Sequence, residues 1–424
     1  MDVAYIMAGI SVLIIFSYLF DAFARRTQFP SVILLIATGI GLRWLADATN
    51  YHIPYLDRII PTFGTIGLIL IVLEGALELE INKKKRGIII QGFLSALITL
   101  LLTAFGLAFM FHEWMGIPFL ESLLDATPLA IISSAVAIPS AAGLLNKDKE
   151  FVVYESTFSD ILGIVLFYFL KSHLVNDSTG LALEVPKLVT AGSFMSLIFE
   201  IILVVIISLV VTYILIELIA KISHKVKFFL ILSLLILAYV IAKKFHLSAL
   251  IIVFFFGLFM SNSRNLLPIR WRKYINTTKA EEGLHEFHIL TAESTFLIRT
   301  GFFLFFGFNI TVDMFLSGET YIYGLAILGV ILAVRFLYLG VTQPKKLVPT
   351  GFIAPRGLIT ILLFLDLPIE FSNKIINEKV LLIVILGSMI IMLTGLLITG
   401  KKKGKNDGEG GEKVNVDFNT VGDV

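Results

Sequence analysis

Apolar segments of membrane-spanning length recur along most of this 424-residue chain. A helix needs roughly 20 mostly apolar residues to cross about 30 Å of hydrocarbon. The segments are continuously apolar rather than alternating, so they predict helices rather than the strands of a β-barrel. Thirteen segments meet this description: 3–23, 30–46, 60–79, 87–111, 127–145, 151–171, 193–220, 228–242, 246–261, 286–309, 321–342, 349–366 and 380–399.

The composition excludes a water-soluble domain. Hydrophobic residues make up 57% of the chain and charged residues 16%, whereas soluble domains average about 45–50% and about 25%. We therefore expect an all-α polytopic membrane protein with about 13 transmembrane helices over residues 1–400, surrounded by lipid. Residues 401–424 are polar and rich in glycine, which predicts a disordered cytoplasmic tail. The chain has no cysteine and a net charge of +2, and we expect no cofactor and no nucleic-acid partner.

The distribution of basic residues predicts the orientation in the membrane. Loops rich in Lys and Arg stay in the cytoplasm. Alternate connections hold most of the 34 basic residues, at 25–26, 83–86, 147–149, 221–227, 264–279, 345–346 and 401–413. With an odd number of spans, the N-terminus is then outside and the C-terminus cytoplasmic. We expect this orientation in a plasma (inner) membrane.

The sixth predicted span carries a strongly polar stretch. Its sequence Glu-Ser-Thr-Phe-Ser-Asp at 155–160 holds two carboxylates and three hydroxyls, and leads directly into an apolar run. On a helix, Ser156 and Asp160 share one face, and Glu155 and Ser159 share another. An ionisable residue deep in a span is costly, so it indicates function. We expect Asp160 to bind a monovalent cation or a proton, with Ser156 and Ser159 adding oxygen atoms. The alternative is a buried Asp that neighbouring hydroxyls satisfy.

Two further spans contain residues that interrupt helices. The fifth holds Ser133, Ser134 and the mid-span Pro139, and the twelfth holds Pro355 and Arg356. Both are predicted to unwind and to line a cavity, although ordinary proline kinks are the alternative. The two spans take the same place in the first six and the last six spans. Paired breaks of this kind indicate two inverted repeats, as in secondary transporters whose sites lie where broken helices cross.

Five short stretches carry a resemblance to a known family. They are 73–79 (Leu-Glu-Gly-x-Leu-Glu-Leu), 155–160 (Glu-Ser-x-x-Asn-Asp or Asp-Asp), 302–307 (Phe-Phe-x-x-x-Gly), 333–335 (Ala-Val-Arg) and 356–357 (Arg-Gly). In this order they resemble the monovalent cation:proton antiporter superfamily, in particular sodium/proton exchangers with thirteen helices. The resemblance covers residues 1–400. The chain departs from the family at Ser159, where exchangers have Asn or Asp, and at 133–135, where Ser-Ser-Ala replaces Thr-Asp-Pro.

The resemblance implies an antiporter, not an enzyme, that exchanges a monovalent cation for H⁺ by alternating access. Na⁺ is the expected cation, before Li⁺ or K⁺, and pH homeostasis the expected role. Asp160 would hold the cation and the proton in turn, near Ser133 and Ser134. Glu155 would form a core ion pair with Arg335 or, failing that, with Arg299. The family further implies a homodimer.

Glu74 in the third span, together with Pro139, Pro355 and Arg356, would support the site. Glu74 fits either an ion path or a hydrogen bond between packed helices.

The stoichiometry expected from the resemblance is electroneutral. Electrogenic members combine paired acids in the sixth span with a lysine in the tenth. Here Ser159 and Arg299 take those places, which leaves Asp160 as the group that exchanges protons. The alternative function is a K⁺ efflux or uniport-type cation pathway of related architecture. A membrane enzyme has little support, because no Ser-His or His-Glu constellation lies within a predicted span.

Overall fold

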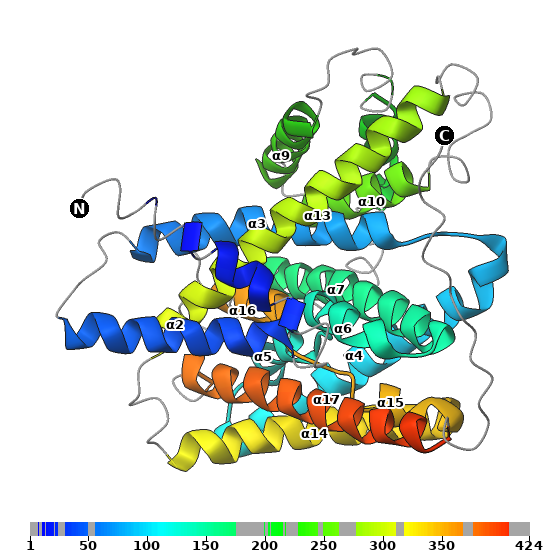
Figure 1. Cartoon of the computed structure of the whole chain (residues 1–424). Coiled ribbons are helices and arrows are strands. Elements are labelled where there is room, and N and C mark those ends of the chain that lie inside the picture. The colour runs from blue at the N-terminus through cyan, green and yellow to red at the C-terminus, as the bar shows by residue number, and fades with distance from the viewer. Residues whose placement is uncertain are drawn as a thin grey trace.

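A computed structural model of the chain describes residues 30–49, 56–174, 205–214, 228–244, 249–262, 277–310, 318–367 and 376–406, with isolated stretches within 7–23 and 199–217. Every regular element in this described part is helical. Most of the long helices run side by side in one direction, and α13 (Thr277–Phe308) crosses them obliquely (Figure 1). The prediction of an all-α polytopic protein is confirmed.

The helices coincide with the predicted spans. Among the described residues, seven helices are long and apolar enough to cross a membrane: Ser31–Ala48, Arg86–Met115, Phe119–Ser140, Asn146–Ser172, Gly283–Phe308, Thr320–Thr342 and Glu378–Ile398. Helices also cover four further predicted spans, at 60–79, 228–242, 246–261 and 349–366. The predicted spans 3–23 and 193–220 are described only in part, and their described residues are helical, notably 14–20 and Val205–Ile214.

The helices form two bundles. A scaffold bundle contains α2 (Ser31–Ala48), α3 (Leu56–Glu78), α9 (Phe228–Lys244), α10 (Ala249–Ser261) and α13. A core bundle contains α4 (Arg86–Met115), α5 (Phe119–Ala130), α6 (Ser134–Ser140), α7 (Asn146–Leu174), α14 (Gly318–Thr342), α15 (Leu347–Thr350), α16 (Leu358–Leu365) and α17 (Glu378–Asn406). Within the core bundle, α7 packs against α4, α5 and α6, and α14 packs against α17 and α4. Contacts between the bundles run mainly through α3, with smaller contributions from α10 and α13.

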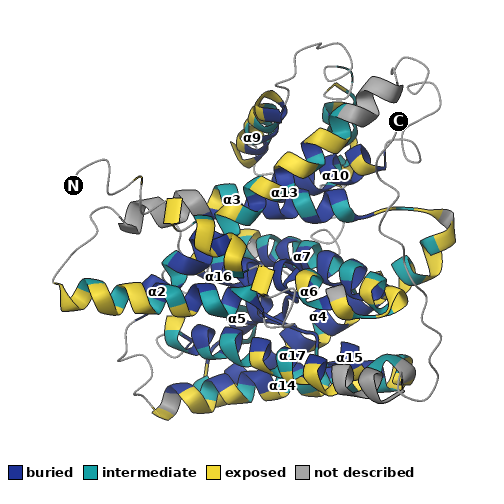
Figure 2. Cartoon of the chain, in the orientation of Figure 1, coloured by how far each residue is buried: buried dark blue, intermediate teal, exposed yellow. Residues whose placement is uncertain are grey.

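The outer faces of the helices are apolar. On α14, Ile322, Leu325, Leu337 and Val341 are each more than 60% exposed. Figure 2 shows exposed residues along the outer helices and buried residues where α5, α6, α7 and α16 meet. An apolar exterior around an interior that includes buried polar side chains suits a bilayer, because lipid cannot hydrogen-bond to polar groups.

The fifth and twelfth spans are broken helices, as predicted, but the first break is displaced. Residues 131–133 separate α5 from α6, and residues 351–357 separate α15 from α16. The predicted unwound stretch runs from Ser133 past Pro139, yet only Ser133 lies in the break and Pro139 lies inside α6. Pro128 instead lies in the last turn of α5, where it removes a backbone donor just before the chain unwinds. Pro355 lies within the second break.

The start of the expected tail is helical. Helix α17 continues to Asn406, so the first six residues of the predicted tail, 401–406, belong to the last helix. The prediction of disorder for 407–424 lies outside the described residues.

A polar contact outside the spans joins the end of α3 to the start of α7. The Lys85 ammonium lies 3.0 Å from a carboxylate oxygen of Glu80 and 3.1 Å from one of Glu150. The hydrogen bond to Glu80 is the main reason why the pKa of Lys85 is raised. The Tyr154 hydroxyl also donates to the Glu80 carbonyl at 2.6 Å. The two bundles are therefore tied together at this end of α3.

Helices α2 and α13 approach each other through two glycines. A Cβ added to Gly307 would lie 2.9 Å from the Ile36 Cα and still closer to the Ile36 carbonyl oxygen. A Cβ added to Gly39 would similarly meet the backbone of residues 304–308. Small residues let membrane helices approach at backbone distance, where van der Waals contact drives their association.

Replacing Gly307→Ala should therefore destabilise the protein. Backbone atoms of Ile36 cannot rotate away from the new methyl group, and overpacking of this kind costs about 1–3 kcal/mol. Thermal unfolding in detergent should show a lower midpoint than wild type. Gly329→Ala on α14 is the matched control, because an added Cβ there meets no atom within 4 Å. Equal midpoints for the two variants would contradict the packing argument.

Candidate functional site

Helix α7 positions most of the polar side chains predicted from the sequence. Glu155, Ser156, Thr157, Ser159 and Asp160 are all buried, with 1–4% of their surface exposed. They lie in the middle of a 29-residue helix, on several of its faces. A polar stretch of this kind is stable in a membrane only if neighbouring elements supply partners.

The first break supplies backbone partners for two of these side chains. The Ser134 N–H donates to Asp160 Oδ2 at 3.1 Å, and the Ile132 N–H donates to Ser159 Oγ at 2.9 Å. Both donors are free because residues 131–133 are not helical and because the first N–H groups of a helix have no partner within it. The other oxygen of Asp160, Oδ1, has no hydrogen-bond partner.

The two breaks also bond to each other. The Ser133 N–H donates to the Pro355 carbonyl at 2.9 Å. A Cβ on Gly357 would lie 2.5 Å from Ser133 Oγ and 3.1 Å from a methyl of Val136, so only glycine lets the breaks approach this closely. Ser133 is fully buried and its Oγ has no hydrogen-bond partner. The structure thus brings Ser133, Ser134, Ser159 and Asp160 together around the crossing of the broken helices.

The Ser156 hydroxyl bonds to its own helix. It donates to the carbonyl of Val152 at 2.7 Å, one turn back on the same helix. The sequence grouped Ser156 with Ser159 as a source of oxygen atoms for the ion. In this structure the Ser156 hydroxyl donates its proton within α7, and the Ser159 hydroxyl accepts a hydrogen bond from the first break.

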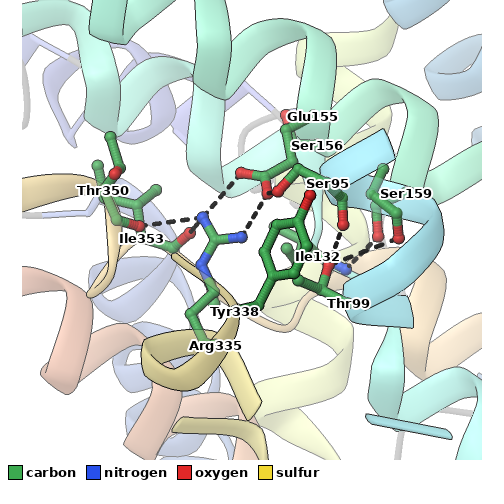
Figure 3. A network of polar contacts seen from close by, with 12 residues as sticks. Ser95, Thr99, Ile132, Glu155, Ser156, Ser159, Arg335, Tyr338, Thr350 and Ile353 are labelled. Carbon is green, nitrogen blue, oxygen red and sulfur yellow. Dashed lines mark hydrogen bonds and ion pairs between the residues drawn. The ribbon is translucent and has the colours of Figure 1, made fainter. Parts of the chain in front are cut away.

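Glu155 forms a bidentate ion pair with Arg335 of α14. Arg335 Nη1 lies 2.5 Å from Glu155 Oε1, and Nη2 lies 2.7 Å from Oε2. Nη2 also donates to the carbonyls of Thr350 at 3.0 Å and Ile353 at 3.2 Å. Figure 3 shows the guanidinium between the carboxylate and these two carbonyls. Arg335 therefore joins α7 to the end of α15 and to the second break.

Arg299, the other candidate partner for Glu155, points elsewhere. Its Nη1 lies 3.4 Å from the Ala135 carbonyl in α6. Arg356 is buried in the second break. Its main-chain N–H donates to Ser388 Oγ at 2.9 Å, and its side-chain Nη1 lies 3.4 Å from the Ala354 carbonyl. Among the described residues, neither arginine forms an ion pair.

Two partners in this network carry no signal in the sequence. Ser95 of α4 donates to Glu155 Oε1, and Ser388 of α17 accepts the Arg356 N–H. Each is a serine in an apolar span, and small hydroxyl residues are common in membrane helices. Only their positions in the folded bundle reveal that Ser95 contacts a buried carboxylate and that Ser388 binds a main-chain N–H of the second break.

Two cavities open toward opposite ends of α7, each between the core and scaffold bundles. The larger, about 670 Å³, is lined by Glu74, Ala135, Pro139, Lys149 and Arg299 among others. Lys149 lies in the first turn of α7, and Ala135 directly follows the residue that binds Asp160. The smaller, about 350 Å³, is lined by Gly64, Tyr168, Phe302, Leu362 and Asp366 among others. Tyr168 lies near the last turns of α7.

This arrangement defines a class of protein before any comparison. A buried carboxylate beside two broken helices that cross is the architecture of an inverted-repeat secondary transporter. A sequence model of the family described as "Sodium/hydrogen exchanger, transmembrane" matches residues 11–400. The chain therefore belongs to the sodium/hydrogen exchanger family and is an integral membrane cation:proton antiporter. This family consists of transporters rather than enzymes.

The solved structures with a similar fold include two of the sodium proton antiporter MjNhaP1 of Methanocaldococcus jannaschii. Its structure at pH 8 matches with a TM-score of 0.64 and 21% identity over 95% of this chain and 100% of that one. A second structure, from an electron-microscopy map, matches with a TM-score of 0.65 and 20% identity, over 97% of this chain and 100% of that one. At these identities the likeness concerns the fold. A comparison with curated proteins gave no match.

The ion pair generates a stability prediction. Glu155→Ala leaves the Arg335 guanidinium buried without its carboxylate, which should cost roughly 3–5 kcal/mol. Asp160→Asn keeps the shape of the side chain and an oxygen that can accept from the Ser134 N–H, so it should cost less. Thermal unfolding of both variants in the same detergent compares them. If Asp160→Asn melts lower than Glu155→Ala, the Glu155–Arg335 pair does not stabilise the core bundle.

Proposed function

We propose that the protein exchanges Na⁺ for H⁺ and that Asp160 is the shared binding site. The observation that carries this proposal is the position of the Asp160 carboxylate. It is buried, one oxygen accepts from the first residue of a half-helix, and the other oxygen has no partner. In a site shielded from water, an uncompensated carboxylate is costly, so it takes up either a proton or a cation. Competition for one group then couples the two fluxes.

The neighbouring residues divide into two roles in this proposal. Ser133 and Ser134 lie beside Asp160 and supply hydroxyl oxygens to the cation, while Ser159 holds the first break in place. Glu155 and Arg335 hold the core bundle together and do not take part in exchange. Pro355 and Arg356 shape the second break. Glu74, which lines the larger cavity with Arg299 and Pro139, belongs to the path along which the cation reaches the site.

Two cavities at opposite ends of α7 support an alternating-access mechanism. The larger cavity reaches α6 next to the residue that binds Asp160. On the other side, α3 and α16 close against each other, since a Cβ on Gly64 would lie 2.5 Å from a methyl of Leu362. We infer that movement of the core bundle against the scaffold bundle closes the larger cavity and opens the smaller one. Asp160 then faces each side in turn.

The distribution of basic loops supports an orientation with the N-terminus outside and the C-terminus in the cytoplasm. In this orientation the larger cavity, which contains Lys149, opens to the cytoplasm. We propose a plasma-membrane location and a homodimer that lipid surrounds, in line with the family resemblance. Removal or uptake of protons by this exchange would serve pH homeostasis.

The role of Asp160 is tested by Asp160→Asn, which retains the shape of the side chain but cannot ionise. Purified protein in liposomes with an imposed pH gradient should show Na⁺-dependent proton flux for wild type. The variant should fall to the level of protein-free liposomes, while its elution profile in detergent stays that of wild type. Exchange at the wild-type rate in the variant would remove Asp160 from the mechanism. Parallel runs with Li⁺, K⁺ and Ca²⁺ identify the cation and test the K⁺-pathway alternative.

The stoichiometry should be one proton per monovalent cation, without net charge movement. Ser159 carries no charge, and Arg299, unlike a lysine, keeps its proton in proteins. Setting the membrane potential with valinomycin and K⁺ should therefore leave the Na⁺ flux unchanged at a fixed pH gradient. A flux that rises steeply with potential would show that charge is moved. The test requires that K⁺ first be shown not to be a substrate.

A further inference from the structure

Thr157 has a buried hydroxyl that does not bond to its own helix. The side chain is 2% exposed, and its Oγ1 has no hydrogen-bond partner. Several buried threonines donate one turn back along their helices, as Thr99 does to the Ser95 carbonyl at 2.6 Å and Thr291 to the Phe287 carbonyl at 2.7 Å, whereas Thr157 and Thr360 do not. Buried polar atoms are rarely left without a partner, so the unpaired Thr157 hydroxyl calls for an explanation.

The position of Thr157 places it beside the candidate ion site. It precedes Asp160 by three residues, and residues three apart lie one turn apart on one face of a helix. From a Cβ built on Gly75 of α3, the Thr157 methyl would be 3.4 Å away and the Ser134 hydroxyl 4.0 Å away. Thr157 and Ser134 thus meet α3 at the same point, next to Glu74, which lines the larger cavity.

Two oxygen atoms on this face of α7 therefore lack partners, Thr157 Oγ1 and Asp160 Oδ1. A hydroxyl and a carboxylate are both ligands for hard cations, which bind through oxygen. We propose that the Thr157 hydroxyl is a ligand of the transported cation and that it raises the affinity of the site for this cation. The inference rests on the proposed role of Asp160.

The resemblance to the family does not specify this residue. Position 157 falls on the first unspecified place in the Glu-Ser-x-x-Asn-Asp pattern. A hydroxyl at this place adds an oxygen atom to the site in a chain that has Ser159 where the pattern has Asn or Asp. Ser159 already accepts from the Ile132 N–H, whereas Thr157 is free to face the ion.

The test compares Thr157→Val, which keeps the shape and loses the hydroxyl, with Thr157→Ser, which keeps the hydroxyl. Na⁺ is titrated in proteoliposomes at a fixed pH gradient, and Na⁺-induced thermal stabilisation is measured in detergent. Thr157→Val should raise the KM for Na⁺ by about tenfold or more, as for loss of one polar contact to a charge. Its maximal rate should stay within about twofold of wild type. Thr157→Ser should restore the wild-type KM.

Thr291→Val is the matched control, because it removes a buried hydroxyl that is satisfied within α13. It should leave the KM for Na⁺ and the stabilisation by Na⁺ unchanged. An active wild type with an unchanged KM in Thr157→Val would overturn this inference alone. A lower maximal rate at unchanged KM would overturn it too, since that result indicates a structural role. A wild-type protein without exchange of Na⁺, Li⁺ or K⁺ would overturn the proposed function and this inference together.

Discussion

The arginine of the Arg335–Glu155 ion pair provides hydrogen bonds to backbone carbonyls in a region where lipid can provide none. The second break ends a helix in the interior of the core bundle, beside the carbonyls of Thr350 and Ile353. Arg335 Nη2 donates to both carbonyls, and Nη1 and Nη2 together bind Glu155. A buried ion pair adds little stability relative to well-packed apolar residues. Its value here lies in making an unwound chain possible at membrane depth.

Helix α7 connects the two breaks because opposite parts of its polar stretch face different elements. Glu155 reaches Arg335 and, through it, the second break, while Ser159 and Asp160 accept from the first break. The Ser133 N–H then joins the breaks directly through the Pro355 carbonyl. Each contact fixes the position of an unwound backbone segment relative to α7 or to the other break. A carboxylate held in this way has a fixed position within the core bundle.

The contacts to Asp160 and Ser159 come from main-chain N–H groups. Any residue except proline supplies such a donor, which explains physically how Ser-Ser-Ala can stand at 133–135 where the family has Thr-Asp-Pro. The requirement at the crossing is steric instead. Gly357 must lack a side chain because Ser133 and Val136 occupy the space beside it. The same reasoning applies to Gly39 and Gly307, where α2 and α13 touch through their backbones.

The sequence by itself determined the helical class, most of the spans and the polar stretch of α7 that faces the breaks. These features follow from local hydropathy and from the cost of a charge in lipid, which a stretch of about twenty residues reveals. Tertiary structure decided between Arg335, the first expected partner of Glu155, and Arg299. It also decided that the first break lies at 131–133 with Pro139 inside α6, that Ser95 contacts the Glu155 carboxylate and that Ser388 binds the main-chain N–H of Arg356. Those outcomes depend on donors and acceptors that are tens to hundreds of residues apart in the chain. Packing of the helices brings them within hydrogen-bonding distance, and no local pattern records which of them will meet.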